Sequence, residues 1–136
     1  MKPEILVVAA ALYDRQGQVL IAERPAGRQL AGRWEFPGGK VMPGESEHAA
    51  LARELREELG IEVTASRPCM RLRHAYEDRD VELSLWIIER FTGEPSSLEG
   101  QRLRWVPPAQ LADCDLLEAD RPFVAALALL APPARR

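Results

Sequence analysis

One amphipathic segment near the middle of the chain constrains this sequence most. Ser46 is a favourable cap before it and Gly60 a favourable stop after it, so we expect a helix over residues 47–59. At about 100° per residue, three leucines form one apolar stripe and three glutamates form an acidic face beside it. The leucines are Leu51, Leu55 and Leu59. The apolar stripe predicts burial against a sheet, while the acidic face can line a cleft.

The acidic face opposes ordinary helix stability. It consists of Glu54, Glu57 and Glu58. Glu54 and Glu58 are a like-charge pair that costs about 0.2–0.5 kcal/mol, and Glu57 and Glu58 lie at the negative end of the helix dipole. Arg53 precedes Glu57 by one helical turn, so a solvated surface with ion pairs is the alternative. Carboxylates about 4 Å apart repel by roughly 4 kcal/mol at an effective dielectric of 20, so a buried cluster needs a cation. Hard oxygen ligands favour Mg²⁺, for which Mn²⁺ can substitute.

Composition limits the class of protein. The 136 residues fit one domain, expected over residues 1–131, with a flexible tail at 132–136. The net charge is −3 and no long basic run is present, which argues against a nucleic-acid partner but not against a nucleotide substrate. No apolar stretch reaches the roughly 18 residues that span a bilayer. Cys69 and Cys114 are isolated thiols without metal spacing, so we expect a cytoplasmic protein, and we assign neither thiol a role. We also expect a monomer without a membrane partner.

The remaining pattern predicts mainly strands. Residues 5–13 form an apolar run typical of a strand buried on both faces, and residues 18–23 are expected to pair with it across a turn. Further strands are expected at 34–36, 61–64, 70–76, 81–91 and 101–106, with a final helix at 121–130. The segments 70–76 and 81–91 should form a long hairpin. Strands surrounding a helix and a terminal helix indicate an α+β fold.

Nine positions resemble the signature of the Nudix hydrolases. They are Gly39, Glu45, Arg53, Glu54, Leu55, Glu57, Glu58, Gly60 and Ile61. The preceding segment, Trp-Glu-Phe-Pro-Gly-Gly-Lys at 34–40, is similar to the MutT-type branch, and the similarity covers nearly the whole chain. The resemblance implies the Nudix fold, an α/β/α sandwich with a mixed central β-sheet. It also implies Mg²⁺-dependent hydrolysis of a diphosphate linked to another group; MutT-type enzymes cleave nucleoside triphosphates to the monophosphate and pyrophosphate.

The resemblance also implies the residues of a metal site. The ligands are expected to be Glu54, Glu57, Glu58, the Gly38 carbonyl and Glu99. Glu99 lies on a loop, where a carboxylate is either solvated or a ligand or base. Glu54 is our choice of general base, and Arg53 is expected to pair with a carboxylate and fix loop and helix. Glu45 would anchor the helix or lie in the outer shell of the metal.

A second set of residues is expected to contact substrate. Arg24 and Lys40 are candidate phosphate contacts, Phe36 and Tyr76 are candidate neighbours of the base, and Arg79 is a further candidate. Asp120 stands where MutT proteins that remove 8-oxo-dGTP usually have Asn. An ionised carboxylate only accepts hydrogen bonds, so Asp120 could accept from N7–H of 8-oxoguanine or from the amino group of cytosine. It could also cap the last helix.

Three functions follow from these alternatives. The first is hydrolysis of oxidised nucleoside triphosphates, chiefly 8-oxo-dGTP, which cleanses the nucleotide pool and so prevents mutation during DNA replication. The second is a pyrophosphohydrolase for CTP, dCTP or modified pyrimidine triphosphates. The third is a non-catalytic nucleotide sensor. A sensor would be free to lose Arg53 and the three helix glutamates, and all four are retained.

Overall fold

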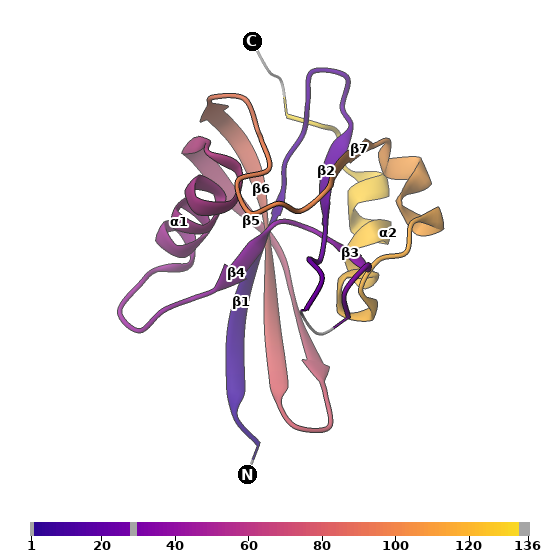
Figure 1. Ribbon diagram of the computed structural model, residues 1–136. Coiled ribbons are helices and arrows are strands. Elements are labelled where there is room, and N and C mark those ends of the chain that lie inside the picture. The colour runs from indigo at the N-terminus through magenta and orange to yellow at the C-terminus, as the bar shows by residue number, and fades with distance from the viewer. Residues whose placement is uncertain (1, 28–29, 134–136) are drawn as a thin grey trace.

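The computed structural model describes residues 2–27 and 30–133. Figure 1 shows two helices on opposite sides of the strands, α1 (Glu47–Leu59) and α2 (Pro122–Leu129). The strands are β1 (Glu4–Ala11), β2 (Val19–Glu23), β3 (Trp34–Glu35), β4 (Gly38–Lys40), β5 (Glu62–Ala75), β6 (Asp80–Thr92) and β7 (Leu103–Val106). Two short 3-10 helices, η1 (Pro108–Asp113) and η2 (Glu118–Asp120), precede α2. The predicted α+β class is confirmed.

The strands form two sheets. One has the order β4-β1-β6-β5 and the other the order β3-β2-β7. β1 and β6 run parallel, from Glu4 opposite Asp80 to Ala11 opposite Ile87, whereas β1 with β4 and β5 with β6 are antiparallel. The larger sheet is therefore mixed, as expected. With a helix on each side, the arrangement is the predicted α/β/α sandwich (Figure 1).

Strand β1 separates two hydrophobic cores. Its alternate side chains Val8 and Ala10 pack into the core that contains the leucine stripe of α1. Ala9 and Ala11 pack into the other core, which contains Phe123 of α2. All four side chains are at most 3% exposed, so this part of the predicted strand is buried on both faces, whereas residues 5–7 are only partly buried.

One predicted pairing is wrong. Residues 18–23 were expected to pair with residues 5–13, but β2 pairs with β3 and β7 in the other sheet. Only an isolated bridge between Tyr13 and Val19 and one hydrogen bond from Leu20 to Leu12 link the two segments. The reason is that β4 and β6 occupy both edges of β1. Residues 61–64 and 70–76 are also one strand, β5, whose register shifts between Val63 and Met70.

Helix α1 begins and ends where the sequence predicted. The Ser46 hydroxyl accepts from the backbone N–H of Ala49 at 3.1 Å. Gly60 has φ +72°, a conformation that strains residues with a side chain, and its N–H bonds to Arg56 O. Within the described residues no helix is long and apolar enough to cross a membrane. Of the expected tail, residues 134–136 lie outside the described residues.

Candidate active site

A cavity of about 790 Å³ lies beside α1 and β4. All the site residues expected from the sequence except Glu45 line it. These residues are Arg24, Phe36, Gly38, Lys40, Arg53, Glu54, Glu57, Glu58, Tyr76, Arg79, Glu99 and Asp120. They come from strands, loops, α1 and η2, so the fold brings these candidates into one space.

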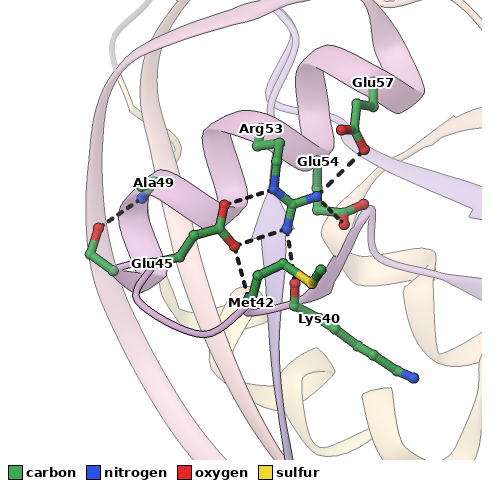
Figure 2. A network of polar contacts seen from close by, with 8 residues as sticks. Lys40, Met42, Glu45, Ala49, Arg53, Glu54 and Glu57 are labelled. Carbon is green, nitrogen blue, oxygen red and sulfur yellow. Dashed lines mark hydrogen bonds and ion pairs between the residues drawn. The ribbon is translucent and has the colours of Figure 1, made fainter.

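The acidic wall of the cavity consists of Glu54, Glu57, Glu58 and Glu99. Arg53 binds Glu54 and Glu57 of this wall, as Figure 2 shows. Its guanidinium donates to both carboxylate oxygens of Glu45 at 2.7 and 3.0 Å, and to Glu54 Oε1 at 2.9 Å. It also donates to the Lys40 carbonyl at 3.1 Å and reaches Glu57 at 3.5 Å. A planar fork of donors suits such bidentate binding. Arg53 thus joins β4, the following loop and α1.

Glu45 belongs to this network rather than to the cavity lining. Besides Arg53, it accepts from the backbone N–H of Met42 at 2.9 Å. The hydrogen bonds from Arg53 and Met42 lower the pKa of Glu45 to about 2. Glu45 therefore stays ionised and holds the Arg53 guanidinium against the loop that precedes α1. This contact agrees with the expected role as a helix anchor.

Glu54 lies against the backbone of β4. A Cβ atom at Gly39 would collide with the Glu54 carboxyl group, so any other residue at this position would displace that carboxyl group. Burial raises the pKa of Glu54, and the hydrogen bond from Arg53 opposes this shift. Nearby Glu57 and Glu99 raise the pKa further. The signature glycine and the helix glutamate are thus linked by close packing.

Glu58 is the most deeply buried of the helix glutamates. Its Oε2 atom has no hydrogen-bond partner among the described residues. Burial raises the pKa of Glu58 to about 9, and Glu54, Glu99 and Glu35 add to the shift, while an N–H bond from Gly38 opposes it. An unsatisfied carboxylate at a wall of carboxylates is poorly stable without a cation.

The donor set fits a divalent cation in its chemistry. All expected ligands present oxygen atoms, which suits Mg²⁺ or Mn²⁺. Within 2–27 and 30–133, however, no three His, Cys, Asp or Glu side chains are already gathered into a metal-binding group. Glu57 shows why: its side chain is 54% exposed and turned toward Arg53. The unpartnered Glu58 oxygen is the observation that favours a cation.

Asp120 lies in a different part of the cavity lining. Its side chain is buried, and its Oδ2 accepts from the backbone N–H of Phe36 at 3.1 Å, across 84 positions of sequence. Burial raises the pKa of Asp120 to about 7; the Phe36 N–H and Arg24 oppose the shift and Glu35 adds to it. The helix-cap alternative is wrong, because α2 begins at Pro122 and no side chain caps it. The carboxylate instead lines the cavity and binds the Phe36 backbone.

Two of the expected base neighbours, Phe36 and Tyr76, lie near Asp120. Phe36 packs against Phe123 of α2, with ring centroids 6.3 Å apart. The guanidinium of Arg79 lies 5.0 Å from the centroid of Tyr76. Burial raises the pKa of the Tyr76 hydroxyl, and the charge of Asp120 adds to that shift. These contacts place two expected base neighbours near one buried carboxylate, which we call the Asp120 end of the cavity.

Two polar residues of this region, Glu35 and Gln101, were not predicted from the sequence. Glu35 lines the cavity, binds Arg24 at 3.1 Å and raises the pKa of both Glu58 and Asp120. A signal was available, because strand alternation places Glu35 opposite the buried Trp34. Gln101 is a buried polar residue beside the end of α1, and nothing in its local sequence indicates this.

The sequence comparisons agree with this geometry. The NUDIX domain family matches residues 8–126. The CTP pyrophosphohydrolase of Escherichia coli is 40% identical, over 93% of this chain and 94% of that protein. The 8-oxo-dGTP diphosphatase of E. coli is 32% identical, over 91% of this chain and 96% of that protein.

A solved structure agrees as well. A MutT structure from work on Aliivibrio salmonicida and Vibrio cholerae has a TM-score of 0.80 and 34% identity, and the match covers 91% of this chain and 96% of that one. The family match, the relatives and the solved structure therefore agree with one another. The chain belongs to the Nudix hydrolase family, in its MutT-type branch.

Proposed function

We propose that this protein hydrolyses oxidised nucleoside triphosphates, chiefly 8-oxo-dGTP, to the monophosphate and pyrophosphate. One observation carries the proposal: a single cavity holds both the acidic wall with the unpartnered Glu58 oxygen and the buried carboxylate of Asp120. The first suits a charged triphosphate with its cation, and the second suits a base. We further propose that the enzyme is a cytoplasmic monomer that removes damaged nucleotides before DNA replication.

The acidic wall would hold the divalent cation through Glu54, Glu57, Glu58, Glu99 and the Gly38 carbonyl. When bound, Mg²⁺ or Mn²⁺ would neutralise phosphate charge and favour ionisation of the attacking water. Glu54 would accept the proton of that water, and the burial that raises its pKa supports this role, because a raised pKa favours proton uptake.

Positive side chains complete the phosphate site. Arg53 fixes the orientation of Glu54 through the 2.9 Å hydrogen bond. Lys40 and Arg24 line the cavity and would contact the phosphates. Arg24 is already held by Glu35 at 3.1 Å, so its position is set before substrate arrives. Such prior ordering lowers the cost of orienting a substrate.

The Asp120 end would read the base. Guanine presents N7 as an acceptor, and oxidation at C8 converts N7 to an N–H donor. The ionised form of Asp120 would accept from that donor and repel the normal base. Because Oδ2 is held by the Phe36 N–H, the other carboxylate oxygen is the one to face the base. Phe36 and Tyr76 would contact the base beside it.

A second candidate is hydrolysis of CTP, dCTP or a modified pyrimidine triphosphate. The observation that favours it is the 40% identity to a CTP pyrophosphohydrolase. The cytosine amino group is a donor, so it offers Asp120 the same type of hydrogen bond as N7–H of 8-oxoguanine. The two candidates therefore share the chemistry of the acidic wall and differ in the nucleoside, chiefly in its base.

The experiment is a nucleotide panel assayed for pyrophosphate release with Mg²⁺. The panel contains 8-oxo-dGTP, dGTP, CTP, dCTP and 5-methyl-dCTP at matched concentrations. The first candidate predicts the highest kcat/KM for 8-oxo-dGTP. The highest value for a cytosine nucleotide would replace it with the second candidate. Failure to release pyrophosphate from any of them would reject both.

A further inference from the structure

The loop between β6 and β7 closes the C-terminal end of α1. The backbone N–H of Ser96 donates to the Leu59 carbonyl at 3.0 Å, and that of Leu98 donates to the Glu58 carbonyl at 3.1 Å. The last carbonyl groups of a helix lack partners within the helix, so these bonds satisfy them. The same loop carries Glu99, which lines the cavity.

Gln101 joins this loop to the helix. It is 7% exposed, and its side-chain oxygen accepts from the Ser97 hydroxyl at 2.8 Å and from the Glu99 N–H at 3.1 Å. Its amide nitrogen donates to the Glu58 carbonyl at 3.3 Å. One buried side chain therefore bonds to the backbone of two residues that supply carboxylates to the acidic wall.

We propose that Gln101 is a positioning residue that holds Glu99 beside Glu58 and thereby sets the affinity of the acidic wall for divalent cations. The inference rests on the proposed function, in which both carboxylates bind the cation. The two carboxylates repel each other, as the effect of Glu99 on the pKa of Glu58 indicates. Residues bonded to ligands orient them and tune metal affinity. Without the amide of Gln101, the loop has fewer hydrogen bonds that keep Glu99 close to Glu58.

The first test is Gln101→Met, which keeps an apolar stem of similar length and removes all three hydrogen bonds. Mn²⁺ binding is measured by electron paramagnetic resonance of free Mn²⁺, with the full chain and without nucleotide. We expect binding to weaken by about tenfold, the usual size of such an effect. In the Glu99→Gln background, the same substitution should change binding by less than about twofold, because the ligand it positions is gone.

Ser84→Ala is the matched control. Ser84 is also a buried polar residue, 3% exposed, and accepts from the Trp86 ring N–H at 3.0 Å, but it does not line the cavity. Ser84→Ala should lower Tm without changing Mn²⁺ affinity. A fall in affinity equal to that of Gln101→Met would show that general destabilisation explains both, and would overturn the proposal.

Three further outcomes would each overturn it. They are unchanged Mn²⁺ affinity in Gln101→Met, an unchanged affinity in Glu99→Gln, and a full tenfold loss that persists in the Glu99→Gln background. Each can occur while the wild-type protein binds Mn²⁺ and releases pyrophosphate, which leaves the proposed hydrolysis standing, although the second would remove Glu99 from the expected ligands. Absence of Mn²⁺ binding by the wild-type protein would instead overturn the proposed function as well.

Discussion

The acidic wall and the Asp120 end of the cavity are built in different ways. Three of the carboxylates of the wall come from one helix, and Arg53 of the same helix binds two of them, Glu54 and Glu57, together with Glu45. The Asp120 end combines Phe36 with a carboxylate 84 positions away. The wall therefore depends on helical geometry within a short segment, whereas the Asp120 end depends on the tertiary fold. We infer that the wall supplies the shared chemistry and the Asp120 end supplies substrate choice.

Removal of the divalent cation should give the largest effect, because it disables the acidic wall for every substrate. With excess EDTA, pyrophosphate release should fall to background, since the carboxylates and phosphates repel each other. Added Mg²⁺ or Mn²⁺ should restore it. Assays use 8-oxo-dGTP and CTP in parallel. Full turnover without metal would disprove the assignment of the wall.

Glu57→Gln should give the next largest effect. The substitution keeps the volume and removes one charge from the wall, so kcat should fall by at least about 10²-fold for all nucleotides. The fold should remain intact, because Glu57 is half exposed. Glu62→Gln is the matched control: Glu62 pairs with Arg56 at 2.8 Å just beyond the helix and does not line the cavity. Near wild-type turnover in Glu57→Gln would show that the charge of Glu57 is merely solvated and does not contribute to catalysis.

The acidic wall was easier to predict from the sequence than the Asp120 end. The cap at Ser46, the stop at Gly60 and the buried stripe of α1 were predicted correctly, because helical periodicity places residues three and four apart on one face. The glutamates beside that stripe were expected in the cavity for the same reason, and they line it.

Long-range contacts account for the errors. The short turn after β1 suggested a hairpin, yet β4 and β6, which come later in the chain, occupy both edges of β1. Asp120 lies before a helix and suggested a cap, yet its carboxylate bonds to Phe36 instead. Gln101 gave no local signal, because its partners at Glu58 and Glu99 are brought together only by the fold.

Asp120→Ala tests whether the Asp120 end of the cavity selects the substrate. If Asp120 accepts from N7–H of 8-oxoguanine, the preference for 8-oxo-dGTP over dGTP should fall by roughly 1–3 kcal/mol in the ratio of kcat/KM. The loss should appear mainly in the oxidised substrate. Weakening of a CTP preference would favour the second candidate. Glu118→Gln, an exposed neighbour in η2, is the control. A lower Tm with unchanged substrate ratios would leave Asp120 a purely structural role.

The smallest expected effect is a pH dependence of substrate choice. Burial raises the pKa of Asp120 to about 7, so the carboxyl group is mostly neutral at pH 6 and mostly ionised at pH 8. Only the ionised form is limited to accepting hydrogen bonds, whereas the neutral form can donate to N7 of normal guanine. The ionised fraction rises from about one tenth to about nine tenths over this range, so the preference for 8-oxo-dGTP should increase by up to about tenfold.

Measuring the ratio of the two kcat/KM values isolates this effect from the acidic wall. Titration of the wall changes both substrates alike, because each carries the same triphosphate, and so cancels in the ratio. In Asp120→Asn the side chain cannot ionise, so the ratio should not vary with pH between 6 and 8. A ratio that is flat in the wild-type protein, or that rises equally in Asp120→Asn, would show that Asp120 does not read the base. In that case the division between a shared acidic wall and a selective Asp120 end would fail.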